Sequence, residues 1–344
     1  MNATLWITNR CNLRCKYCYE GEKLNSSVIQ PQTIEASIDF LRDKIDYSNE
    51  LTHIRIHGGE PLLYFDLLTY IVNAYKKTFG DKVDFEITTN ATLLTPHIAS
   101  YLLKEMAHIG ISIDGASESH NKNRVSFNGE GTYDIVTEKI KLFPDLHNKI
   151  SARMTITPDT VSSLTKNVQH LVELGFTIVE PVPDVFISSW SKETAHILHM
   201  EYVNLAKYQS ELGDSVKIYG IDAARHKVKN SPCNGGITSF HIDSNGDIYP
   251  CMLSVGNKEY CLGTVYKPGE YNYSLLQEFA AWDKEMMEKC SGCSRYHYCD
   301  ATRCKLINYM YTGDKNTPIP MMCAMTNIQY DTCAHFLQFS HVQE

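Results

Sequence analysis

The segment Ala3-Thr4-Leu5-Trp6-Ile7-Thr8 is apolar and partly β-branched, and it leads directly into Asn9-Arg10-Cys11-Asn12-Leu13-Arg14-Cys15-Lys16-Tyr17-Cys18. The apolar run predicts a buried strand. The cysteines follow at its carboxyl end, where α/β folds place their chemistry. Their C-x3-C-x2-C spacing puts three thiolates in one loop, and thiolates are the ligands of iron–sulfur clusters. The next cysteine is Cys233, so three local ligands would leave one iron of a [4Fe–4S] cube open.

Two other interpretations of the three cysteines remain. They could belong to a zinc site, which needs four nitrogen or sulfur ligands, with His57 or a distant cysteine as the fourth. They could also form disulfides in a secreted protein. Their position directly after a buried strand favours the cluster.

The composition limits the class of protein. The chain has 344 residues, 43% of them hydrophobic, which is enough for one large or two moderate domains. A net charge of −8 without a long basic run argues against a nucleic-acid or anionic-membrane partner, and no apolar stretch approaches a membrane span. Twelve cysteines without a secretion signal indicate metal ligation in a reducing compartment, so we expect a cytoplasmic protein.

Strand-like and helix-like patterns alternate through the first half of the chain. The expected strands cover residues 3–8, 53–57, 85–89, 109–113, 152–156 and 177–179. The expected helices cover residues 31–45, 67–79, 98–106, 133–143 and 164–174. Such alternation predicts an α/β fold with a parallel sheet and helices outside. Six units are fewer than the eight of a closed barrel, so we expect a partial (β/α)6 TIM-like barrel with a lateral mouth.

Three regions follow from these patterns. We expect the partial barrel in residues 1–190 and a helical bridge in residues 191–230. Residues 231–344 contain nine of the twelve cysteines and many turn-forming runs, which predicts a separate cysteine-rich extension. The sequence contains no internal repeat and no low-complexity tract.

Further motifs follow the expected strands. Gly58-Gly59-Glu60 comes after the second strand, where glycines let the backbone approach a ligand closely. Ser112-Ile113-Asp114-Gly115 and His120-x-x-x-Arg124 follow the fourth. Together with C-x3-C-x2-C, these runs resemble the radical SAM superfamily. A loop of helix caps and surface salt bridges is the plain alternative for residues 112–124.

The resemblance implies that Cys11, Cys15 and Cys18 hold a [4Fe–4S] cluster whose open iron binds S-adenosylmethionine (SAM). Gly58, Gly59 and Glu60 would contact the SAM amino group. Ser112 and Arg124 would hold its ribose and carboxylate, since an arginine offers a fixed fork of donors. Tyr17 would lie over the adenine or serve simple packing, and Val185 would be an adenine neighbour. Thr89-Asn90-Ala91 resembles a common T-N-G run, from which Ala91 departs.

The C-terminal third resembles the SPASM extension, which carries auxiliary iron–sulfur clusters, here expected to be two [4Fe–4S] clusters. By resemblance one cluster is held by Cys290, Cys293, Cys299 and Cys323. The other is held by Cys233, Cys251 and Cys304, although four residues separate Cys299 from Cys304 where the family has three.

Three details of the extension stay open. Cys261 is either a fourth ligand of the second set or a buried thiol, in which case an open iron could take a substrate thiolate. Zinc is the alternative for the C-x2-C pair. Cys333 is expected to pack in the core of a C-terminal helix.

The resemblance also implies the chemistry. SAM would be cleaved to methionine and a 5′-deoxyadenosyl radical, which abstracts hydrogen from a peptide or protein substrate. The electron would come from a donor such as flavodoxin or ferredoxin. Many such maturases carry an N-terminal peptide-recognition domain, for which we see no room before Cys11. We therefore expect leader recognition by the barrel mouth, the bridge or a separate protein.

The leading hypothesis is a maturase of ribosomally made peptides that forms a thioether or another crosslink. The second is an anaerobic sulfatase-maturating enzyme, which oxidises Ser or Cys to formylglycine. That branch has an aspartate after the cysteine matching Cys251, but here the position is Met252, which cannot accept a proton. Asp243, Asp247 and Glu259 lie nearby, none in the matching place. The third is a non-catalytic electron-transfer or scaffold protein. No general base is assigned.

Overall fold

The computed structural model describes residues 1–21, 27–46, 50–144, 149–221, 231, 233–280 and 286–340. The chain forms two compact units and enters each of them more than once. The first unit comprises Met1–Ser112, Asn121–Pro144 and Asn234–Glu278. The second comprises Ile113–His120, Asp145–Cys233 and Phe279–Glu344. Segments of the expected barrel and of the expected extension therefore occur in both units.

The first unit contains the strand order β10-β9-β8-β1-β2-β3-β4. Its strands are β1 (Asn2–Thr8), β2 (Thr52–Gly58), β3 (Val83–Thr89), β4 (His108–Ser112), β8 (Ser239–Ile242), β9 (Asp247–Tyr249) and β10 (Gly263–Thr264). β1 to β4 pair in parallel, as the alternating pattern predicted. β8 is parallel to β1 on its other edge, with Phe240 opposite Ala3. β9 pairs antiparallel with both β8 and β10.

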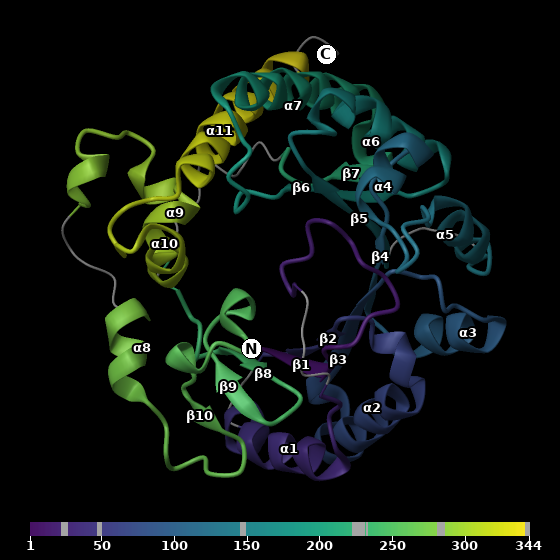
Figure 1. The fold of residues 1–344 in the computed structure, drawn as a ribbon, viewed down its shortest axis with the longest axis vertical. Helices are drawn as coiled ribbons and strands as arrows, with labels where there is room; N and C mark the ends of the chain where they lie inside the picture. Colours follow the sequence, from purple (N-terminus) through teal and green to yellow (C-terminus); the bar gives the residue numbers. More distant parts are fainter. Residues whose placement is uncertain are drawn as a thin grey trace. The chain divides into compact units, whose positions relative to one another are not determined.

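Helices α1, α2 and α3 lie along one side of β1–β4 (Figure 1). The helices wholly or partly in this unit are α1 (Pro31–Asp46), α2 (Phe65–Phe79), α3 (Pro96–Glu105), α4 (Ser117–Asn123), α5 (Tyr133–Ile140) and α8 (Tyr273–Ala280). The core contains alternate strand residues such as Ile54, Ile56 and Phe85, together with Ile71 and Tyr75 of α2. Because side chains alternate along a strand, the intervening residues of β2 and β3 point to the opposite face.

α5 is shorter than the sequence predicted, since it ends at Ile140 rather than Phe143. The N–H groups of Leu142 and Phe143 instead bond to the carbonyls three residues back, at 3.0 Å each. Phe143 precedes Pro144, whose ring disfavours the helical conformation for the residue before it. The hydrophobic periodicity used for the prediction does not reveal this steric effect of proline.

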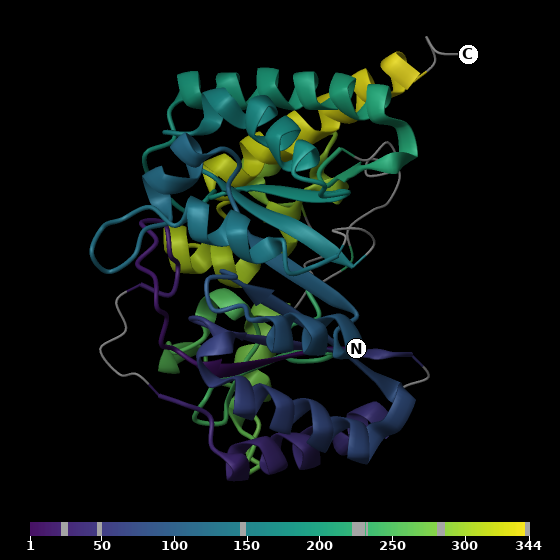
Figure 2. The ribbon, with the colours of Figure 1, turned by 90° about the vertical axis from the view of Figure 1, so that its right-hand side faces the viewer.

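The second unit contains the parallel strands β5 (Ile150–Ile156), β6 (Ile178–Pro183) and β7 (Lys217–Ile218). Its helices are α6 (Leu164–Glu173), α7 (Lys192–Leu212), α9 (Asp300–Arg303), α10 (Lys305–Thr312) and α11 (Pro320–Ser340). α11 packs along α7, as Figures 1 and 2 show from two sides. Cys333 is fully buried on α11, in agreement with its expected packing role. Residues 222–230 of the expected bridge lie outside the described residues.

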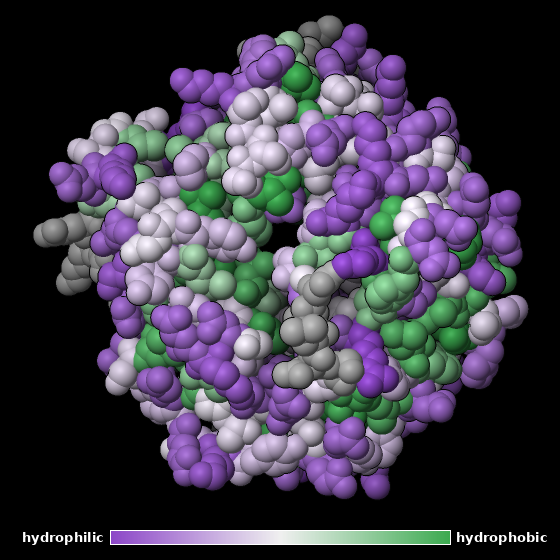
Figure 3. Space-filling model, in the orientation of Figure 1, coloured by the Kyte–Doolittle hydropathy of each residue, from purple (hydrophilic) through white to green (hydrophobic). Residues whose placement is uncertain are grey.

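Hydrophilic residues cover much of the face seen in Figure 3, with hydrophobic residues in smaller groups between them. Exposed large apolar side chains include Phe127 and Tyr273. Single exposed apolar residues are usual on folded proteins. In the part of the chain that the structure describes, no helix has both the length and the apolar character of a membrane span.

Candidate active site

The cysteine loop follows the carboxyl end of β1, as the sequence predicted. It contains three free cysteines, Cys11, Cys15 and Cys18. The backbone N–H groups of Arg14 and Lys16 donate to carbonyls of Val125 and Asn123 at 2.8 and 2.9 Å. The N–H of Cys18 donates to the carbonyl of Cys15 at 3.1 Å. The loop is therefore anchored between β1 and residues 123–125.

The three thiols lie near one another. Burial, together with the nearby Glu60, Cys15 and Cys18, raises the pKa of Cys11 to about 12, although the Leu13 N–H opposes the shift. A thiolate, not a thiol, is the metal ligand, so the protein alone disfavours the ligating form and a cation would stabilise it. Three cysteines in one loop are a donor set that fits an iron–sulfur cluster.

Gly58 and Gly59 allow β2 to end against the start of the cysteine loop. A Cβ on Gly58, whose φ is +144°, would lie 2.2 Å from the carbonyl oxygen of Thr8. A Cβ on Gly59 would lie 2.2 Å from that of Arg10. The N–H groups of Gly59 and Glu60 donate to these two carbonyls at 2.9 Å each. Only glycine fits this close backbone approach.

Glu60 is fully buried and connects β2 to the end of β3. Its carboxylate accepts hydrogen bonds from the hydroxyl of Thr89 and the N–H of Asn90, both at 2.7 Å, and from the N–H of Leu62 at 3.0 Å. Burial raises the pKa of Glu60, and the three hydrogen bonds oppose that shift. Glu60, which was predicted to contact SAM, therefore also links β2 to the end of β3.

Asn90 and Ala91 have roles that the sequence did not reveal. Asn90 Nδ2 donates to Asn12 Oδ1 at 2.9 Å and lies 3.8 Å from Cys11 Sγ. Ala91 has a φ of +63°, a left-handed conformation that favours glycine. The departure from the T-N-G run thus has a conformational consequence. The run itself was the available signal, but nothing local pointed to its partners.

The aromatic and basic residues predicted to hold SAM are partly brought together. The Arg124 guanidinium, which is buried, lies 5.3 Å from the centre of the Tyr17 ring. Ser112 is the last residue of β4 in the same unit. Val185 belongs to the second unit, after β6.

A second polar group lies beside the cysteine loop. The Tyr19 hydroxyl and His57 Nε2 are hydrogen-bonded at 2.5 Å, and Trp6 Nε1 donates to Glu20 Oε1 at 2.7 Å. The edge of one ring meets the face of the other between Trp6 and His57, with centres 4.8 Å apart. Sequence reasoning considered His57 only as a zinc ligand and missed this group.

The second unit brings together four of the predicted auxiliary ligands: Cys290, Cys293, Cys299 and Cys323. Burial and then the neighbouring thiols raise the pKa of Cys290 and of Cys323. The N–H of Cys293 donates to the carbonyl of Cys290 at 3.0 Å in a tight turn. Four thiols near one another fit a shared iron–sulfur cluster. Among the described residues, no three His, Cys, Asp or Glu side chains are grouped for a single metal ion.

The other predicted auxiliary ligands are divided between the units. Cys251 follows β9 and Cys261 precedes β10, so both stand at the same end of this antiparallel pair. Cys261 Sγ lies 3.2 Å from the carbonyl oxygen of Gly263. Cys233 and Cys304 belong to the second unit, and Cys304 is the N-cap residue of α10.

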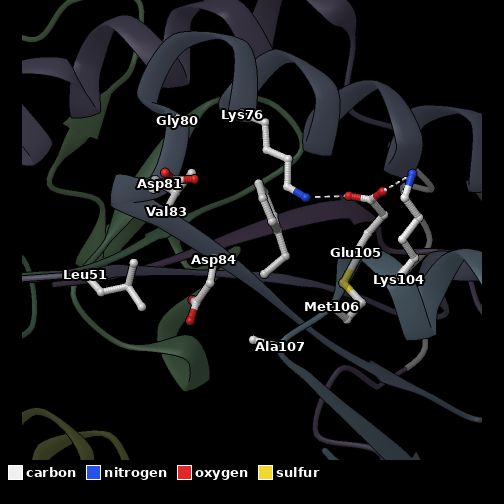
Figure 4. Close-up of a pocket in the computed structure, with 11 residues that line it drawn as sticks. Leu51, Lys76, Gly80, Asp81, Val83, Asp84, Lys104, Glu105, Met106 and Ala107 are labelled. Carbon is white, nitrogen blue, oxygen red and sulfur yellow. Dashed lines mark hydrogen bonds and ion pairs between the residues drawn. The ribbon is translucent and has the colours of Figure 1, made fainter.

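A pocket in the first unit lies at the amino ends of β3 and β4, away from the cysteine loop at the carboxyl end of β1. Lys76 and Lys104 both point to Glu105 within it (Figure 4). The hydrogen bond from Lys76 holds the pKa of Glu105 below its usual value. In barrels of parallel strands, residues at the amino ends contribute to stability, and catalytic residues lie at the carboxyl ends.

Comparison with known families identifies the arrangement. The radical SAM superfamily matches residues 6–171, and the SPASM iron–sulfur cluster-binding domain matches residues 233–294. The chain belongs to the radical SAM superfamily, in its SPASM-domain branch. This radical SAM protein is therefore an enzyme of a family whose cofactors are iron–sulfur clusters and SAM.

Three similar proteins illustrate the branch. The radical SAM protein is 25% identical over 84% of its length to a cysteine-type anaerobic sulfatase-maturating enzyme of Clostridium perfringens, of which 84% is covered. It is 25% identical over 77% of its length to the subtilosin biosynthesis protein AlbA of Bacillus subtilis, of which 57% is covered. The solved structure "Native anSMEcpe with bound AdoMet and Kp18Cys peptide" has a TM-score of 0.81 at 19% identity, covering 99% of this chain and 98% of that one. At 19% identity, the similarity to this solved structure shows the fold alone.

Proposed function

We propose that this radical SAM protein is a maturase that modifies a ribosomally made peptide by forming a thioether or another crosslink. The observation that carries the proposal is a polar face on the parallel sheet of the first unit. We define the polar face as His53, Arg55, His57, Asp84 and Glu86, which alternate with buried residues along β2 and β3.

The polar face is paired across strands. His53 Nδ1 and Asp84 Oδ1 are 2.7 Å apart, and Arg55 Nη2 donates to Glu86 Oε2 at 2.7 Å. Barrel interiors are normally filled with bulky apolar residues. The side chains of His53 and Arg55 are instead 43% and 47% exposed. A solvated row of donors and acceptors suits a ligand that has many polar groups, such as a peptide backbone.

The polar face also leads to the cysteine loop. His57 directly precedes Gly58-Gly59-Glu60 and is hydrogen-bonded to Tyr19, the residue after Cys18. A peptide lying along the face would reach the residues proposed to hold SAM. The peptide present in the anSMEcpe structure supports a substrate of this kind.

The cofactor assignments form part of the proposal. Cys11, Cys15 and Cys18 would hold the SAM-binding cluster, with Tyr17, Glu60 and Arg124 among the SAM contacts. Cys290, Cys293, Cys299 and Cys323 would hold one auxiliary cluster, and Cys233, Cys251 and Cys304, with Cys261, the other. When bound, SAM and its cluster supply a radical able to abstract hydrogen from an unactivated carbon. Asn90 holds Asn12 of the cysteine loop, and Glu60 holds the end of β3, so this part of the site is ordered before the substrate binds.

The partners and the compartment are inferred from chemistry. Reduction of the cluster requires an electron donor such as flavodoxin or ferredoxin, and a separate protein could recognise a peptide leader. None of the twelve cysteines is in a disulfide. Free cysteines of this number suit a reducing compartment, so we place the protein in the cytoplasm.

Sulfatase maturation is the second candidate. The similarity to the Clostridium perfringens enzyme, which extends over 84% of both chains, favours it. Against it, Met252 stands where the sulfatase-maturating branch has its aspartate. It begins a single turn, Met252–Ser254, after Cys251. A thioether side chain offers no proton acceptor of useful strength, so we rank this candidate second.

Anaerobic co-expression with short peptides encoded beside the gene tests the proposal. With the wild type, the peptide should lose the mass of two hydrogens per modified site and should have fewer free thiols. With Cys15→Ala, the peptide should be unchanged. An unchanged peptide with wild type would contradict the proposal and favour a sulfatase-type peptide, checked by formylglycine formation. Absence of SAM cleavage by the wild type would favour the scaffold hypothesis.

The polar face can be tested separately. Arg55→Gln should raise the KM for the peptide while uncoupled SAM cleavage stays near that of the wild type. Arg42→Gln is the matched control, because Arg42 pairs with Asp39 on the exposed side of α1. Equal KM values in both variants would contradict a peptide site on this face.

A further inference from the structure

Helix α11 carries a polar stripe that faces the loop of Cys290, Cys293 and Cys299. We define the stripe as Cys323, Thr326, Asn327, Tyr330 and Asp331. Spacings of three and four residues place these side chains on one side of a helix. The stripe therefore continues the face from which Cys323 approaches the other three thiols.

Arg295 joins the cysteine loop to the stripe. It lies between Cys293 and Cys299, and its Nη2 donates to Asp331 Oδ1 at 2.7 Å. Its guanidinium lies 4.5 Å from the centre of the Tyr330 ring. Its Nη1 donates to Asn327 Oδ1. Charge-assisted bonds of this kind are stronger than neutral ones, so the loop is held in one register against α11.

The contact with Arg295 fixes the orientation of the Asn327 amide. A guanidinium has no acceptor, so it must face the carbonyl oxygen of the amide, and the NH2 group points the other way. Asn327 Nδ2 lies 3.1 Å from the carbonyl oxygen of Cys323 and 3.9 Å from its Sγ. The NH2 group has two protons, so it can donate to both atoms at once.

Thr326 also lies close to a ligand sulfur. Its Oγ1 lies 3.3 Å from Cys299 Sγ and 3.2 Å from the carbonyl oxygen of Met322. A hydroxyl has one proton, so these two acceptors compete. Asn327 can therefore donate to Cys323 Sγ and to a carbonyl oxygen at once, whereas the single proton of Thr326 serves one acceptor at a time.

We propose that Asn327, oriented by Arg295, is a positioning residue whose N–H···S hydrogen bond to Cys323 sets the reduction potential of the cluster held by the four thiols. Thr326 acts in the same direction through Cys299. The inference rests on the ligand set assigned under the proposed function, but not on the peptide substrate. Hydrogen bonds to ligand sulfurs stabilise the more negative, reduced state and so raise the potential.

The test uses the full-length chain, reconstituted with iron and sulfide without oxygen. Cys11, Cys15 and Cys18 are replaced by Ala to remove the SAM-binding cluster. Asn327→Leu removes the donor, and Asn327→Asp removes it while leaving an acceptor for Arg295. Gln329→Leu is the matched control, an amide on α11 that lies off the stripe. Iron per chain and the midpoint potential are measured by an EPR-monitored redox titration.

Both Asn327 variants should keep the iron content of the parent and shift one midpoint potential to more negative values, whereas Gln329→Leu should not. An unchanged potential at equal iron content, or an equal shift in Gln329→Leu, overturns the proposal. Loss of iron from both Asn327 variants also overturns it, because the residue would then be needed for loading. The test does not measure peptide modification. The midpoint potential can therefore be interpreted even if the maturase proposal is wrong. Unchanged iron content in Cys323→Ala would show that the ligand set itself is wrong.

Discussion

Asn90 donates a hydrogen bond to the side-chain oxygen of Asn12 at 2.9 Å, which joins the end of β3 to the cysteine loop. Asn12 in turn donates to the hydroxyl of Thr92 at 2.8 Å. The sheet fixes β3, so the conformation of the chain around Cys11 depends on this pair of amides.

Removal of the Asn90 side chain should loosen the loop. Asn90→Ala leaves Asn12 without its donor, and we expect a loss of about 1–2 kcal/mol in the free energy of unfolding of the metal-free protein. Iron per chain after anaerobic reconstitution should fall as well. Asn73→Ala, at an exposed position on α2, is the control. Equal stability and iron content in the two variants would show that the amide pair does not organise the loop.

Ala91 should tolerate glycine unusually well. Ala91→Gly loses a buried methyl group but relieves a left-handed conformation that costs an alanine about 1–2 kcal/mol, so we expect a change within about 0.5 kcal/mol. Ala99→Gly, also buried but within α3, should cost about 2 kcal/mol, from the methyl group and from helix propensity. Chemical denaturation measures both, and equal losses would argue against strain at Ala91.

Gly59 should not tolerate even one added carbon. The Cβ of Gly59→Ala would lie 2.2 Å from a backbone oxygen of Arg10, so β2 and the cysteine loop must separate. We expect a loss of about 3 kcal/mol or more. Gly269→Ala is the control, because its Cβ would meet no atom within 4 Å. A Gly59 variant as stable as this control would disprove the close approach.

The buried Glu60 should give the protein a distinct pH dependence. Burial raises its pKa above the ordinary value of 4.5, so the folded chain keeps a proton that the unfolded chain loses. The stabilisation from this proton is complete below pH 4.5 and declines as the pH rises toward the folded-state pKa.

Unfolding of the metal-free protein checks this sign. The free energy of unfolding of the wild type minus that of Glu60→Gln should decrease as the pH rises from 4.5. Glu138→Gln, at an exposed position on α5, is the control for the substitution itself. A Glu60 difference that rises with pH would mean that the three hydrogen bonds outweigh burial.

Much of the fold was predictable because its signals are local. Each strand of the first half was expected within a few residues, since apolar runs and the helix patterns between them are read from neighbouring positions. The pairing of β8 with β1 was not, because a parallel neighbour from the last third of the chain leaves no mark on either strand. The three-residue error at the end of α5 came from ignoring Pro144.

In the site, as in the fold, local signals were predictable and contacts between distant segments were not. The spacings of the cysteines and the Gly58-Gly59 run pointed to residues that the fold brings to the end of β1 and β2. Asn12 and Cys11, the partners of Asn90, lie 78 and 79 residues away in the chain, so no pattern around Asn90 could indicate a sulfur contact. The spacing from Cys323 to Asn327, one helical turn, was visible in the sequence but has many meanings without Arg295.

The position of β1 between β2 and β8 has a consequence for biosynthesis. β1 leaves the ribosome before every other strand of its sheet, yet one of its edges stays unpaired until residues 239–242 have been made. Open strand edges promote aggregation. A nascent chain halted before β8 should therefore expose this edge of β1 and aggregate.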